Sequence, residues 1–64
     1  MTIEYRVREI EPHTTSWGQK IRQHFEAEAI GHNYFYGAEI EAVARDGIQA
    51  YIRSVGGTPK EVTP

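Results

Sequence analysis

Apolar and polar side chains alternate along the first ten residues of the chain. The apolar positions in residues 2–10 are Ile3, Tyr5 and Val7, and the polar positions between them are Glu4, Arg6 and Arg8. Because successive side chains of a β-strand point to opposite faces, this period of two predicts a half-buried strand. Pro12 ends the pattern, and residues 11–16 have the composition of a polar connection.

Residues 16–30 have an apolar residue at every fourth position, and good helix formers fill most of the others. The repeated positions are Trp17, Ile21, Phe25 and Ala29. Ser16 and Gln19 have the spacing of a capping box, and Gly31 stands where a glycine would end the helix. A strand is the competing interpretation, but it would place Gln19 and Gln23 on the buried side, which is costly. We therefore expect a helix.

Residues 38–55 carry the clearest helical pattern. One face collects the apolar residues Ile40, Val43, Ala44, Gly47, Ile48, Tyr51, Ile52 and Val55. Glu41 and Arg45 stand four residues apart, in the favourable order for an ion pair on a helix. Gly47 costs about 1 kcal/mol of helix propensity relative to alanine, so another element, such as the first helix, is expected to pack closely there. Gly56 and Gly57 then end the helix.

These patterns predict a small α+β domain over residues 1–55, with an N-terminal strand followed by two helices, and a flexible tail over residues 56–64. A single strand has two unpaired edges, whose backbone groups need partners. The partners come either from the same strand of a second subunit or from further strands within residues 17–36. In the second case the domain has a β-β-β-α order with one main C-terminal helix.

Composition narrows the class of protein. A chain of 64 residues with 39% hydrophobic side chains forms one small domain, and the lack of cysteine excludes disulfides and thiolate zinc sites within it. No apolar run approaches the roughly 20 residues that cross a membrane, and residues 1–9 lack the apolar stretch of a signal peptide, so we expect a cytoplasmic protein. The net charge is −2, whereas proteins that hold DNA usually carry a basic excess.

The segment Arg45–Ile52, "RDGIQAYI", resembles the second-helix pattern Arg-x-Ala-Ile-x-x-Tyr-Leu of ribbon-helix-helix DNA-binding proteins. The resemblance implies an intertwined dimer whose paired N-terminal strands enter the DNA major groove. Arg6 and Arg8, together with Glu4, would then face base edges, and the chain would act as a transcriptional repressor or antitoxin on operator DNA. The same segment followed by "GGTP" also resembles the helix and exit of small HicB-type β-β-β-α domains, in which residues 33–36 would be the third strand.

Candidate catalytic and metal-binding residues are few. His24, Glu28 and His32 have a spacing that would present metal ligands on one face of a helix. Zinc sites usually need three or four ligands with supporting partners, so we expect surface side chains and no metal. The hydroxyls of Thr14, Thr15, Ser16 and Ser54 lack a patterned base and read as helix caps. We expect neither catalytic residues nor a cofactor, and therefore no enzyme.

Aromatic and acidic side chains are the strongest candidates for a binding site. The aromatic residues are Tyr34, Phe35 and Tyr36, and the carboxylates are Glu26, Glu28, Glu39, Glu41 and Asp46. Aromatic side chains are enriched at binding surfaces, and a row of negative charge steers a protein towards a basic partner. These residues predict a non-enzymatic regulator or inhibitor that mimics the charge of DNA and docks on a larger, nucleic-acid-binding partner. Anti-CRISPR proteins and other small phage inhibitors have this size and acidity.

Overall fold

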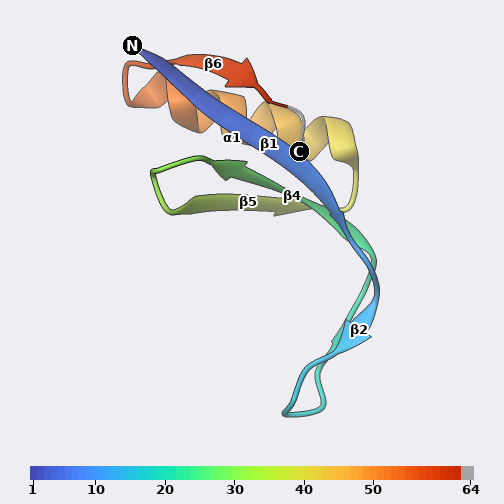
Figure 1. The fold of residues 1–64 in the computed structure, drawn as a ribbon. Coiled ribbons are helices and arrows are strands. Elements are labelled where there is room, and N and C mark those ends of the chain that lie inside the picture. The colour runs from blue at the N-terminus through green and yellow to red at the C-terminus, as the bar shows by residue number, and fades with distance from the viewer. Residues whose placement is uncertain (63–64) are drawn as a thin grey trace.

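A computed structural model describes residues 1–62, which form a four-stranded sheet covered on one face by a helix (Figure 1). The main elements are β1 (Thr2–Ile10), β4 (His24–Ala29), β5 (Tyr34–Ala38), α1 (Glu41–Ser54) and β6 (Thr58–Glu61), and two short strands, β2 (His13–Thr14) and β3 (Lys20–Ile21), pair separately. The order in the main sheet is β5-β4-β1-β6. β4 runs antiparallel to β1 and β5, whereas β6 runs parallel to β1.

The N-terminal strand predicted from the alternating pattern is confirmed. Ile3 and Tyr5 are almost fully buried beneath α1, while the intervening Glu4 faces solvent. Val7 packs at the margin of the same core. The alternation therefore fixes which face of β1 meets the helix.

The C-terminal helix is also confirmed, over Glu41–Ser54. Ala44, Ile48 and Ile52 are fully buried because they recur at intervals of four on the face that meets the sheet. The chain leaves the helix through Gly56, whose φ of +82° suits glycine. α1, the one helix among residues 1–62, is too short and too polar to cross a membrane.

Residues 16–30 are not a helix, so the predicted order of one strand and two helices is wrong. They form a tight turn at residues 16–18, the short strand β3 and the strand β4. β4 lies between β1 and β5, with Ala27 and Ala29 buried against the helix and with Glu26 and Glu28 on the opposite face. Pairing with two strands from other parts of the chain outweighs the helix propensity of these residues.

The features that favoured a helix have other roles in the structure. Gln19 and Gln23 stay exposed because they lie beyond the covered part of the sheet. The hydroxyl of Thr15 accepts a hydrogen bond from the Gln19 backbone N–H, so the predicted capping box is part of a β-turn. Gly31 has a φ of +83° and lies in the turn between β4 and β5.

The alternative β-β-β-α order is right in part, since β1, β4 and β5 precede the single helix. Tyr34–Ala38 form the third main strand, as that alternative expected. Thr58–Glu61, expected in the tail over residues 56–64, pair with Thr2–Tyr5 as β6. Residues 63–64 of the expected tail lie outside the described part of the chain.

Candidate functional site

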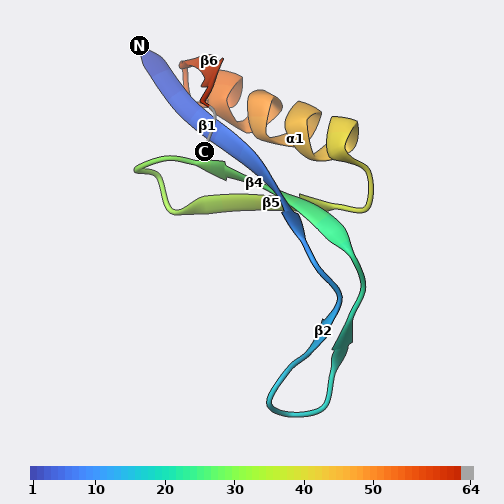
Figure 2. The same cartoon turned by 45° about the vertical axis from the view of Figure 1, so that its right-hand side comes forward.

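A two-stranded arm, residues 11–23, projects from one end of the main sheet (Figure 1 and Figure 2). Within it, β2 and β3 pair antiparallel, with His13 opposite Ile21 and Thr14 opposite Lys20. The molecule measures 41 × 20 × 20 Å along its principal axes, and the arm accounts for the long dimension. The arm therefore carries its tip well away from the core beneath α1.

The tip of the arm is a closed turn with defined hydrogen bonds. The Thr15 N–H donates to the Gln19 carbonyl at 2.8 Å, and the Gly18 N–H donates to the Thr15 carbonyl at 3.0 Å. Gly18 has a φ of +87°, a conformation that glycine adopts without steric cost. This combination is a common three-residue hairpin loop with a glycine bulge. The hydrogen bonds of Thr15 and the glycine at position 18 therefore define the backbone conformation of residues 16–18.

Trp17 lies at this tip with 77% of its surface exposed, although tryptophan is one of the largest apolar side chains. Its indole Nε1 donates a hydrogen bond to Gln19 Oε1 at 3.3 Å. The residue belongs neither to the core nor to the side chains packed against it. An indole held in this way is available to a partner.

The face of the sheet opposite α1 carries two cross-strand ion pairs. Arg6 Nη2 lies 2.9 Å from Glu28 Oε1, and Arg8 Nη2 lies 2.9 Å from Glu26 Oε1. Residues 6 and 28 are opposite each other in the β1–β4 ladder, as are residues 8 and 26. The hydrogen bond with Glu26 raises the pKa of the Arg8 guanidinium above its usual value. Glu26 and Glu28 are thus neutralised locally and do not form part of a helical acidic row.

These pairs also bear on the proposed DNA contacts of Arg6 and Arg8. Each guanidinium already donates to a carboxylate of β4, which reduces its attraction for phosphate or base edges. A ribbon-helix-helix dimer needs two helices after its strand, and residues 1–62 contain one. The two arginines lie on the sheet of a different fold from the one that this resemblance implied.

The aromatic run in β5 divides between the two faces of the sheet. Tyr34 stacks on Tyr51 of α1 with ring centroids 3.8 Å apart, and Tyr36 lies against Gly47 of the same helix. Phe35, on the opposite face, is 46% exposed. Close packing at Gly47 was predicted, but the element that contacts it is β5 and not a first helix.

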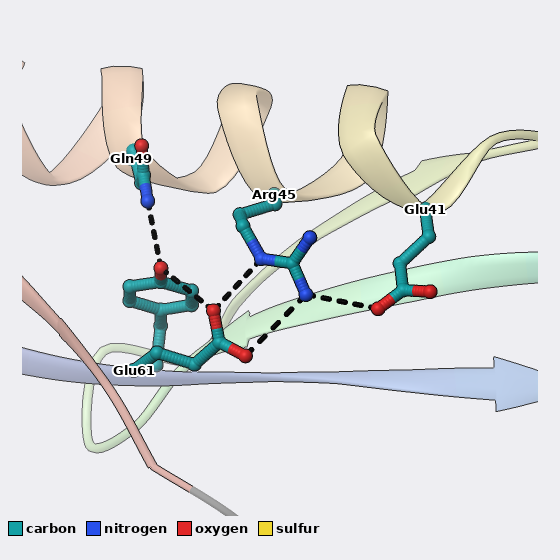
Figure 3. Close-up of polar contacts among 5 residues, drawn as sticks. Glu41, Arg45, Gln49 and Glu61 are labelled. Atoms are coloured by element: carbon teal, nitrogen blue, oxygen red, sulfur yellow. Dashed lines mark hydrogen bonds and ion pairs between the residues drawn. The ribbon is translucent and has the colours of Figure 1, made fainter.

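Glu41 belongs to a polar network that joins α1 to β1 and β6 (Figure 3). Arg45 contacts Glu41 at 2.9 Å and Glu61 at 2.8 Å, which confirms the helical ion pair expected from the spacing. The Tyr5 hydroxyl donates to Glu61 at 3.1 Å and accepts from Gln49 at 2.7 Å. The hydrogen bonds from Arg45, helped by that from Tyr5, lower the pKa of the Glu61 carboxyl. The network fastens β6 to α1.

The eight residues predicted to bind a partner therefore do not form one patch. Two carboxylates and Phe35 lie on the open sheet face, and Glu41 is held in the network with Arg45. Glu39 and Asp46 are exposed and enter none of the ion pairs found within residues 1–62. Glu39 lies in the connection between β5 and α1, and Asp46 lies within α1.

The histidines stay apart from one another. His13 Nδ1 lies 3.0 Å from the Glu11 carbonyl, and His24 Nδ1 lies 2.9 Å from the Arg22 carbonyl, both local backbone contacts. Residues 1–62 contain no group of three or more His, Cys, Asp or Glu side chains arranged to hold a metal ion. Within the same residues the surface forms no pocket.

Trp17 is the candidate that sequence reasoning missed. Its period-four spacing with Ile21 and Phe25 suggested a buried helical stripe, whereas "TSWGQ" also has the glycine of a hairpin turn. Comparison of the chain with family models, curated proteins and solved structures found no match.

Proposed function

We propose that this chain is a non-enzymatic protein-binding regulator, and that its arm supplies the main anchor. The observation that carries the proposal is the exposed indole of Trp17 on a hydrogen-bonded turn. Tryptophan is enriched among the residues that dominate binding energy at protein interfaces. A small chain that keeps its single tryptophan out of a thin core has that side chain free for another molecule.

The gain from burying this indole is large compared with its cost. A tryptophan buries about 200 Å² in an apolar pocket, which at about 25 cal/mol per Å² corresponds to about 5 kcal/mol. The hydrogen-bonded turn already fixes the backbone around Trp17, so the cost of ordering the backbone on binding is small. The pocket that fits this anchor is apolar, with room for one aromatic side chain.

The distribution of charge on the chain indicates the charge of the partner surface around the pocket. The arm carries Lys20, Arg22 and Glu11, which give it a net charge of +1. Because the whole chain has a net charge of −2, the residues outside the arm carry −3. Docking of the arm therefore depends on the indole more than on charge. Glu39 and Asp46 are exposed carboxylates of the acidic remainder, which supports a partner with a basic surface, as nucleic-acid-binding proteins have. A chain of this size regulates such a partner by covering its surface.

Affinity capture with matched variants tests the proposal. The full chain, Trp17→Ala, Trp17→Phe and the neighbouring control Ser16→Ala are immobilised and exposed to a cell lysate, and the retained protein is then purified. We expect Trp17→Ala to weaken binding about 100-fold, equivalent to about 2.7 kcal/mol, with Trp17→Phe intermediate and Ser16→Ala unchanged. Because Trp17 is the single tryptophan, its fluorescence should also shift to shorter wavelength on binding.

Two results would contradict the proposal. One is equal retention of the same partner by Trp17→Ala and the unmodified chain. The other is retention of duplex DNA by the purified chain at physiological ionic strength, which would favour the nucleic-acid alternative. The charge part has its own test: if Glu39→Lys with Asp46→Lys leaves affinity for the partner unchanged, the partner surface is not basic at that place.

A further inference from the structure

The two edges of the main sheet are built differently. β6 carries Pro59 and Lys60, residues that discourage an edge strand from pairing with another chain. β5, the other edge, reads Tyr-Phe-Tyr-Gly-Ala and contains neither proline nor a charged residue. Within residues 1–62 no strand or helix covers the outer side of β5. An apolar, unprotected edge of five residues is a template for strand addition.

The hydrogen-bond pattern shows which backbone groups β5 offers. The Ile30 N–H donates to the Glu4 carbonyl at 2.9 Å, so the even-numbered residues of β4 direct their backbone groups towards β1. Because these directions alternate along a strand, the odd-numbered residues of β4 bond to β5, where Ala27 is opposite Tyr36. The backbone N–H and C=O of Phe35 and Gly37 therefore point away from the sheet.

We propose that β5 pairs antiparallel with β5 of a second copy of this chain, giving a continuous eight-stranded sheet in a two-fold dimer. Tyr36 lies on the two-fold axis, opposite Tyr36 of the second copy. Phe35 is then opposite Gly37 of the second copy, and the two such pairs exchange four backbone hydrogen bonds. The same surface patch is used on both subunits, as a two-fold interface requires.

Side chains on both faces fit this register. On the open face, Phe35 is 46% exposed and would cover Gly37 of the second copy, which has no side chain. On the helix face, Tyr36 is exposed and would meet Tyr36 of the second copy on the axis. The pairing thus covers Phe35 and Tyr36, two of the exposed apolar side chains of the sheet.

The neighbouring register is less favourable. Centring the axis on Phe35 would set two phenylalanines opposite each other and would place Gly37 opposite Asn33. Asn33 has a φ of 50°, which is not extended, so only one hydrogen-bonded pair would form. In the proposed register Glu39 is opposite this asparagine, so no carboxylate faces its own copy across the axis.

Sedimentation equilibrium of the full chain tests the dimer. We expect twice the monomer mass of 7.3 kDa, with Gly37→Pro returning the chain to the monomer mass. Gly37→Pro removes a donor that points away from β4, and a Cβ at this position would meet its nearest atoms at 3.9 Å, so neither change removes a β4–β5 hydrogen bond. Lys60→Ala on the other edge is the matched control and should leave the mass unchanged. A monomer up to about 0.5 mM, an open-ended series of larger species or a dimer unaffected by Gly37→Pro would overturn the proposal.

A cysteine scan tests the register even if Gly37→Pro fails to fold. The natural chain has no cysteine, so a single introduced cysteine gives one disulfide. Residues directly opposite at a non-hydrogen-bonded site lie about 4.5 Å apart, within disulfide range, whereas diagonal positions lie about 7–8 Å apart. Tyr36→Cys should therefore form a covalent dimer on mild oxidation and Phe35→Cys should not. The reverse result, or equal cross-linking of both, would overturn the register.

The proposal is independent of partner binding through the arm. Trp17→Ala should keep the mass of a dimer while losing the partner, and Gly37→Pro should become a monomer whose indole stays exposed. A change in mass on Trp17→Ala would show that the arm and not β5 holds the copies together, and would overturn the proposal.

Discussion

Replacement of Gly47 by alanine sets two effects against each other at one contact. On a solvent-exposed helix position this change stabilises a protein by about 1 kcal/mol, because glycine has a lower helix propensity. At Gly47, a Cβ would lie within 2.6 Å of the Tyr36 Cζ atom, closer than any real contact of this kind. The tyrosine ring of β5 must therefore move for the alanine to fit.

The cost of that movement follows from how much of Tyr36 is covered. The residue is 36% exposed, so about two thirds of a side chain of about 200 Å² is shielded from water. Complete loss of this cover corresponds to about 3 kcal/mol, and partial loss to about 2 kcal/mol. After subtraction of the gain in helix propensity, Gly47→Ala should destabilise the chain by about 1–2 kcal/mol.

A double-mutant cycle with Tyr36→Ala makes the prediction specific. With the ring removed, nothing opposes the added Cβ, so Gly47→Ala should change sign and stabilise the variant by about 1 kcal/mol. Denaturant unfolding followed by circular dichroism gives the four free energies. The titrations should be run at two protein concentrations tenfold apart, since association of copies also contributes to stability.

Two results would refute this reasoning. If Gly47→Ala stabilises the otherwise unmodified chain by about 1 kcal/mol, the position behaves as an ordinary exposed helix site and the ring does not occupy it. If Gly47→Ala destabilises both backgrounds equally, the cost arises from a contact other than that with Tyr36.

Two further predictions concern the core and the polar network. Ile48→Ala should cost about 2–5 kcal/mol and leave so small a domain largely unfolded at 25 °C by circular dichroism, whereas Val43→Ala on the half-exposed side of α1 should keep it folded. Glu61 has a pKa below its usual 4.5 because Arg45 donates to it, so its contribution to stability is complete above that value and is lost as the pH falls through the lowered pKa. Glu61→Gln should therefore reduce the free energy of unfolding at pH 7 and match the natural chain in strong acid, as denaturant titrations over a series of pH values would show. A difference that stays constant with pH would indicate that Arg45 does not perturb this carboxyl.

The partner-binding residues could be predicted from sequence only by residue type. Aromatic and acidic side chains were identified, but their grouping into surfaces depends on cross-strand neighbours 18 and 22 positions away in the chain, as for Arg8 with Glu26 and Arg6 with Glu28. Sequence spacing gives no information on such pairs. Trp17 was assigned to a helix because apolar residues four positions apart share one face of a helix. Residues four positions apart also share one face of a β-strand, so the same spacing fits the arm and β4, into which the arm leads.

The sequence alone determined β1 and α1, because each carries its own signal over nine or more residues. Alternation in β1 and a stripe of apolar residues in α1 are local patterns that hold whichever elements pack against them. Only the tertiary structure decided residues 16–30. Their local preference for a helix is a fraction of a kilocalorie per residue, and the hydrogen bonds and burial that β4 gains between β1 and β5 outweigh it.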